Sequence, residues 1–224
     1  MGPYVHAAGG HYKTALALYR WNMTISAAFL ELLSVTEVLA RNALDEHLRV
    51  WCRRQGGNVE WLLHPDRIPT PLDKLFGSVA AGAYDKAQRA KEVRDKSATH
   101  ARHQLPLTNG DILSQVTFGQ WHTLFPWQEA EKTDQTTNGY RTTIWQAATK
   151  DAFTVGTDPD RIHWLLYRLA YFRNRVAHHE CLLHGDLKNR LDDIFSLLRL
   201  VDPRVHEWAT GHSRVTGLLR QRPG

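Results

Sequence analysis

Hydrophobic residues recur every three or four positions along most of the chain, which is the spacing of a helix with one buried face. The longest such pattern covers residues 13–51 and is interrupted near Asn22 and Thr24, where Thr24 is a candidate cap for a second helix. Its core-facing positions are Leu16, Tyr19, Met23, Phe29, Leu32, Leu33, Thr36, Leu39, Ala40, Ala43, Leu44, Leu48 and Trp51. Gly56-Gly57 then predicts the end of this helix.

The middle of the chain predicts shorter helices separated by polar segments. The expected elements are a helix over 71–102, a helix over 112–125 capped by Asn109-Gly110-Asp111, a loop over 129–140 and a short helix over 141–153. Residues 85–102 are rich in Lys and Arg, which favours a solvated helix face there over an RNA-binding ridge.

The clearest helical patterns lie in the last third of the chain. Asp158-Pro159 predicts a helix start, followed by a core stripe of Leu165, Leu169, Phe172 and Val176. A last helix is expected over 187–201, closed by Asp202-Pro203, with Leu187, Leu191, Ile194, Leu198 and Val201 facing inward. Because no segment shows sustained strand alternation, the sequence predicts an all-α protein: a flexible N-terminus over 1–12, one helical domain over 13–210 and a basic, frayed tail over 211–224.

Composition agrees with a folded protein that has a sizeable core, since 42% of the 224 residues are hydrophobic and 23% are charged. The net charge of +5 is compatible with a polyanionic partner, but charge alone does not separate nucleic-acid binders from other basic proteins. The two cysteines form no CxxC, which is typical of cytosolic thiols. The longest apolar run, residues 25–33, is too short and polar to cross a bilayer, and residues 1–10 lack a signal-peptide pattern. A cytoplasmic protein without a membrane segment is therefore expected.

One segment concentrates polar chemistry at the end of an otherwise apolar helix, Tyr171-Phe172-Arg173-Asn174-Arg175-Val176-Ala177-His178-His179-Glu180. Cations near a helix C-terminus interact favourably with the helix dipole, which accounts for one or two of them. It does not account for their combination with Asn174, an indifferent helix former.

These residue types suit cleavage of RNA by its own 2′-hydroxyl. Histidine exchanges protons near neutral pH, and arginine offers a fixed positive fork to a phosphate that gains charge. Arg173 and His178 are five residues apart, about 140° around an ideal helix, whereas Asn174 and His178 share a face. One helix therefore directs the pair toward the two edges of a groove, and the same helix from a second subunit would bring both pairs around one phosphate.

The segment from Arg173 to Glu180 resembles the Arg-Asn-x-x-x-His signature of HEPN ribonucleases, in the form found in the Abi-like (abortive infection) bacterial family. Three further stretches agree in order: residues 29–44 are similar to that family's first long helix, 111–121 to its central Leu-x-Phe-Gly-x-Trp segment and 190–201 to its closing helix. The likeness extends from about Lys13 to Trp208.

The resemblance implies a HEPN-type helical bundle with additional helices inserted between the first long helix and the motif helix. It implies a metal-independent endoribonuclease without cofactors, in which Arg173 and His178 are catalytic and Asn174 orients them. Such enzymes usually form homodimers with a composite site, and bacterial members act as antiviral or toxin-type effectors under an antitoxin or regulatory partner. The alternative is a non-catalytic RNA- or protein-binding module of a defence complex.

Some positions near the motif leave alternatives open. Glu37, Arg41 and Asn42 either line the site, as the resemblance implies, or provide only an ion pair between Glu37 and Arg41. His179 is a supporting residue, and the alignment favours His178 for proton transfer. Adjacent histidines on a helix diverge by about 100°, so a shared metal ion is not expected.

Overall fold

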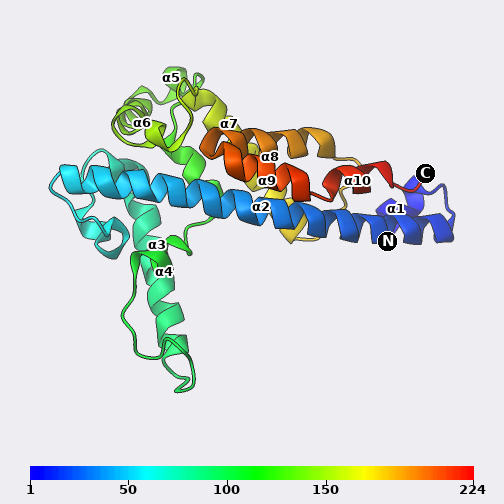
Figure 1. The fold of residues 1–224 in the computed structure, drawn as a ribbon, viewed down its shortest axis with the longest axis horizontal. Helices are drawn as coiled ribbons and strands as arrows, with labels where there is room; N and C mark the ends of the chain where they lie inside the picture. The colour runs from blue at the N-terminus through cyan, green and yellow to red at the C-terminus, as the bar shows by residue number, and fades with distance from the viewer. The chain divides into compact units, whose positions relative to one another are not determined.

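The computed structural model describes the backbone of residues 1–224 and every side chain except that of Glu131. The predicted all-α class is confirmed, because no strand occurs in the part of the chain described (Figure 1). The chain divides into two compact units, unit 1 with Met1–Ala40 and Tyr167–Gly224, and unit 2 with Arg41–Leu166. The segment between the first long helix and the motif helix gathers a core of its own, and the single domain expected over 13–210 stays a prediction.

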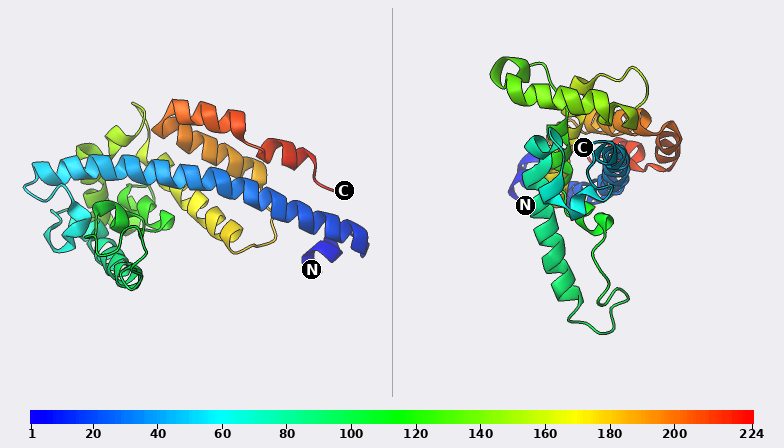
Figure 2. Two further views of the ribbon diagram at one scale, coloured as in Figure 1. Left: turned by 60° about the horizontal axis from the view of Figure 1, so that its bottom comes forward. Right: turned by 90° about the vertical axis from the view of Figure 1, so that its left-hand side faces the viewer.

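Unit 1 contains the two ends of the chain. Its helices are α1 (Gly2–Ala7), the first part of α2 (Tyr12–Arg54), the second part of α7 (Pro159–Ala177), α8 (Leu187–Val201), α9 (Pro203–His212) and α10 (Val215–Arg220). The rings of Phe29 and Phe172 meet edge to face at 4.8 Å in its core, which joins α2 to α7. Helices α8 and α9 lie side by side (Figures 1 and 2).

Unit 2 is built from shorter elements around an aromatic core. It contains the end of α2, the 3-10 helices η1 (Trp61–Leu63) and η2 (Pro65–Arg67), α3 (Leu72–Arg94), α4 (Asn109–Leu113), η3 (Phe118–Leu124), α5 (Ala130–Thr133), α6 (Gln135–Ala147), η4 (Thr149–Ala152) and the start of α7. Phe76 lies between Trp61 and Trp121, at ring distances of 5.9 and 5.1 Å. The buried carboxylate of Asp45 accepts hydrogen bonds from Trp61 and Asn109, so its polar atoms are satisfied.

The two helices with the clearest sequence pattern are confirmed. Helix α7 begins directly after Asp158, whose side chain accepts a hydrogen bond from the amide of Asp160 at 3.1 Å. Helix α8 has the predicted bounds and ends at Asp202-Pro203. The α7 stripe and the first four predicted core residues of α8 are buried.

The predicted break in the first helix is wrong, since α2 is continuous over 43 residues. Thr24 donates its hydroxyl to the Arg20 carbonyl within the helix, and the Asn22 side chain binds the turn at residues 180–182 instead of interrupting α2. The buried face in this part carries Ala15, Leu18, Asn22 and Ile25, whereas the predicted inward residues Leu16, Tyr19 and Met23 are exposed.

The middle of the chain also differs from the predictions. Helix α3 ends at Arg94 and not at residue 102, because the Asp95 side chain binds Lys91 and Arg94 beyond its last turn. The helix expected over 112–125 is divided into α4 and η3, and the loop expected over 129–140 contains α5 and the start of α6. Polar side chains that the hydrophobic spacing ignores start these elements: Thr108 caps α4 and Asp134 caps α6.

Both chain ends are helical, in contrast to the predicted flexible N-terminus and frayed tail. In α1, Tyr4 is buried and meets the ring of Tyr19 edge to face at 5.3 Å. In α10, the Leu218 carbonyl accepts a 2.7 Å hydrogen bond from the Trp21 indole. The first part of α2 therefore anchors both ends of the chain.

Helix α2 is long and apolar enough, by length and composition alone, to cross a membrane. Its most apolar 18-residue window has a mean hydropathy of 1.6, and 44% of that window is buried. The core helix of a water-soluble protein passes the same test. The longest apolar run in the sequence, residues 25–33, covers only part of this helix. That α2 stays outside a membrane remains a prediction.

Candidate functional site

Arg173 lies in the last turns of α7 and is ion-paired across to α2. Its Nε atom is 3.5 Å from Glu37 Oε2, with the Arg173 side chain 41% exposed and the Glu37 side chain 17% exposed. Because the guanidinium is only partly covered, donors remain on its solvent side while the carboxylate fixes its direction. The structure thus brings together Glu37 and Arg173, two of the predicted site residues, in unit 1.

Asn174 and His178 are exposed on a different side of α7. The His178 amide continues the helical bonding with a 2.9 Å hydrogen bond to the Asn174 carbonyl, so both residues keep helical spacing. Tyr167 and Tyr171 precede them at intervals of four and three on the same face, and both are exposed. Among the described side chains, no hydrogen bond joins Arg173 to Asn174 or His178, so the orienting role expected for Asn174 stays a prediction.

His179 occupies the turn that ends the helix and not the helix itself. Its φ of 56° is left-handed, with the Glu180 amide donating to the Arg175 carbonyl at 3.0 Å and the His179 amide to the Val176 carbonyl at 3.1 Å. This is the Schellman end, where glycine is the usual residue. His179 lines an apolar groove of about 440 Å³ with Val176 and the α2 residues Tyr19, Asn22, Met23, Ser26, Ala27 and Leu30. Consecutive histidines therefore face different surroundings.

Arg41 and Asn42 are the predicted site residues that lie outside unit 1. Both belong to the part of α2 that lies in unit 2, and Asn42, five residues from Glu37, is exposed. No ion pair joins Glu37 to Arg41 among the side chains described, and the buried Nε of Arg41 has no hydrogen-bond partner there. Glu37 pairs with Arg173 within unit 1, and the site-lining role expected for Arg41 and Asn42 stays a prediction.

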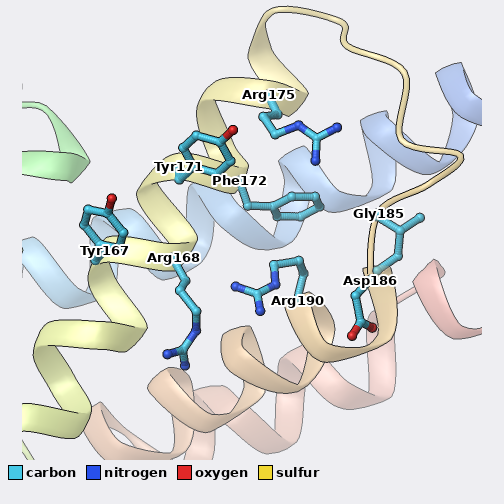
Figure 3. A pocket seen from close by; sticks show the side chains of 9 residues that line it. Tyr167, Arg168, Tyr171, Phe172, Arg175, Gly185, Asp186 and Arg190 are labelled. Carbon is cyan, nitrogen blue, oxygen red and sulfur yellow. The ribbon is translucent and has the colours of Figure 1, made fainter.

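Arg175 faces a cleft between α7 and α8 (Figure 3). Its Nε atom donates to Glu180 Oε2 at 2.9 Å and its Nη2 atom to the Cys181 carbonyl at 3.1 Å. In the same cleft, two hydrogen bonds from Arg168 to Asp193 raise the pKa of the Arg168 guanidinium, which keeps it charged. Sequence reasoning missed this cluster, although Arg168 and Arg175, seven residues apart, share a face of α7.

Asn22 is a second residue that the sequence did not single out. Its Oδ1 atom accepts a hydrogen bond of 2.7 Å from the Leu182 amide, and its Nδ2 atom donates to the Glu180 carbonyl at 3.3 Å. These bonds fasten the turn that follows His178 to α2. A buried asparagine in an apolar helix was the available signal, but its partners are 158 and 160 residues away.

The arrangement offers a partly exposed guanidinium and an exposed imidazole about 140° away around the helix, with a separate arginine-rich cleft between α7 and α8. No group of three or more His, Cys, Asp or Glu side chains lies close enough to hold a metal ion among the residues described. Compared with known proteins, the chain matches no family model, no curated protein and no solved structure.

Proposed function

We propose that this chain is a metal-independent endoribonuclease of the HEPN type, related to the Abi-like family, and that its bundle is the HEPN fold with helices inserted between α2 and α7. The observation that carries the proposal is the Arg173–His178 segment at the end of α7, with Arg173 directed by Glu37 and His178 exposed. Arg173 would bind the phosphate, and His178 would move the proton of the attacking 2′-hydroxyl or of the leaving oxygen. The products would carry 2′,3′-cyclic phosphate and 5′-hydroxyl ends.

The active form would be a homodimer with a composite site, because one α7 directs Arg173 and His178 to different sides. A surface that suits a second copy is the exposed apolar face of α2, formed by Tyr12, Leu16, Tyr19, Met23 and Leu30. Their spacing of four, three, four and seven residues is that of a helix–helix seam. Met23→Glu should convert the dimer to a monomer in light scattering and abolish cleavage.

The biological role that fits such an activity is a cytoplasmic antiviral or toxin-type effector, held in check by an antitoxin or a regulatory partner and triggered by infection. The direct test is cleavage of labelled RNA in EDTA by the wild-type chain and by Arg173→Ala and His178→Ala. Both substitutions should abolish cleavage and relieve growth inhibition in cells. Cleavage that persists in both variants, or that requires added metal, would contradict the proposal.

The second candidate function is a non-catalytic RNA- or protein-binding module. The observation that favours it is the Glu37–Arg173 ion pair itself, because an arginine held by a carboxylate also serves helix packing. This candidate predicts RNA binding without turnover and loss of stability in Arg173→Ala. Comparing turnover with unfolding free energy in the same variant separates the two functions.

A further inference from the structure

The cleft between α7 and α8 combines cationic and aromatic side chains, and its lining does not include Glu37 or Arg173 (Figure 3). It has a volume of about 210 Å³ and is lined by Tyr167, Arg168, Tyr171, Phe172, Arg175, Gly185, Asp186, Leu187 and Arg190. The apolar floor comes from Phe172 and Leu187, which are buried core residues. Such a mixture is typical of a small-ligand or nucleotide site.

Two of its arginines compete for one carboxylate. Arg168 donates to both oxygens of Asp193 at 3.0 and 2.8 Å, and Arg190 Nη1 lies 2.8 Å from Asp193 Oδ2. One carboxylate neutralises one guanidinium, so this end of the cleft keeps a positive charge. Each guanidinium also keeps donors that Asp193 does not use, which suits a phosphate.

The other end of the cleft is less suited to an anion. Asp186 lies there, opposite Arg168 (Figure 3), and caps α8 by accepting from the Asn189 amide. Arg175 is paired at that end with Glu180, whose side chain is 50% exposed. The charge distribution therefore directs a phosphate toward Arg168 and Arg190.

Two tyrosines of α7 line the cleft. Tyr171 is 65% exposed and Tyr167 is 47% exposed, one helical turn apart on α7 (Figure 3). Aromatic rings next to a cationic groove stack with the bases of single-stranded nucleic acid. An acidic peptide would use the arginines, but it would gain little from the ring faces.

We propose that this cleft binds one nucleotide of single-stranded RNA, with its phosphate on Arg168 and Arg190 and its base stacked on Tyr171. The inference rests on the proposed function in taking RNA as the substrate. Because Tyr171 and His178 share one face of α7, a strand held in the cleft would extend along that face toward His178. The cleft would then position the substrate without taking part in the reaction.

The test measures binding rather than cleavage. A short fluorescent single-stranded RNA is titrated, by anisotropy, into chains that all carry His178→Ala, so that the RNA stays intact. Tyr171→Ala should weaken binding about tenfold, whereas Tyr171→Phe should retain it. Arg190→Gln should lower the slope of log affinity against log salt by about 0.7, and Arg190→Lys should keep it.

Matched controls are Trp208→Ala and Arg204→Gln, both exposed side chains of α9 in unit 1 outside the cleft. They should bind RNA as the parent does. The proposal is overturned if the parent binds no RNA, if Tyr171→Ala binds RNA as tightly as the parent, or if the controls lose as much affinity as Tyr171→Ala. It is also overturned if a polyglutamate peptide displaces the RNA equally well from the parent and from Tyr171→Ala, because the site would then recognise charge alone. If Tyr171-dependent binding is found but no RNA is cleaved by the wild-type chain, the proposed function fails and the cleft assignment stands.

Discussion

Arg173 Nε and Glu37 Oε2 lie 3.5 Å apart and join the last turns of α7 to the middle of α2. Glu37 is the more buried partner, so it acts as the fixed side of the pair, and the arginine retains contact with solvent. A guanidinium held in this way keeps its direction while part of its donor set stays available to an anion.

Glu37→Gln should lower the free energy of unfolding by less than about 1 kcal/mol, because the ion pair is partly exposed and solvent screens it. Urea denaturation measures this change. Glu31→Gln is the matched control, since Glu31 pairs with Arg214 on the surface of the same unit and should matter even less. A loss of several kcal/mol in Glu37→Gln would mean that the pair is a buried structural contact.

His179→Gly should stabilise the protein by about 0.5–1 kcal/mol, because glycine adopts the left-handed backbone at this turn without strain. Thermal unfolding measures the gain, and His179→Ala, which keeps the strain, is the comparison. If His178 transfers the proton in the proposed reaction, His179→Gly also keeps RNA cleavage. Loss of cleavage in this variant, with the fold intact, would shift the role to His179.

Acid should destabilise unit 2 through His122, which is partly buried, and His163, which is buried. Burial lowers the pKa of His122 to about 4, from 6.5, and burial also lowers the pKa of His163, which stacks on Trp127 at 4.1 Å. Folding therefore favours the neutral rings. The free energy of unfolding is unaffected by these histidines above pH 6.5 and decreases as the pH falls from 6.5 toward 4, because the unfolded chain binds the protons first. The expected loss is at least about 1 kcal/mol, seen as a falling melting temperature.

The control for the acid effect is a pair of substitutions. His122→Gln should flatten the dependence of melting temperature on pH between 6.5 and 4, whereas His6→Gln, at an exposed position of α1, should leave it unchanged. An equally steep dependence in His122→Gln would show that other groups cause the acid loss.

Asn22→Ala should destabilise the protein by about 1–3 kcal/mol, because the buried Leu182 amide loses its acceptor. Asn22→Asp keeps an acceptor for this amide but sets a buried carboxylate oxygen against the Glu180 carbonyl, so it should lose at least as much. Chemical denaturation ranks the variants. A neutral effect of Asn22→Ala would show that water replaces the side chain at this turn.

The sequence was informative where one strong periodic stripe and an end signal coincide. In α7 and α8, Asp158-Pro159 and Asp202-Pro203 mark a start and an end, and the stripe between them is buried as predicted. The middle of the chain was predicted poorly, because its short elements depend on side-chain caps such as Thr108 with Asp111. Hydrophobic spacing contains no information about such local hydrogen bonds.

The candidate site was predictable only within one helix. The face shared by Asn174 and His178 follows from helical spacing, and both are exposed on it. The partner of Glu37 was not predictable, because the sequence offers Arg41 four residues away while the structure supplies Arg173 from another helix. The same holds for Asp193, whose contact with Arg168 depends on how α8 packs on α7. Its pair with Arg190, three residues away on the same helix, follows from helical spacing.

Unit 1 is assembled from the first and the last parts of the chain, and the Asn22–Leu182 hydrogen bond closes a separation of 160 residues. During synthesis the first part of α2 leaves the ribosome long before α7, α8 and α9 exist, whereas unit 2 is complete in the nascent chain sooner. Until α7 is made, the apolar side of α2 that packs on Phe172 is exposed to solvent. Chaperones bind exposed apolar segments of this kind. The Glu37–Arg173 contact on which the proposed activity depends would then form only after α7 has left the ribosome.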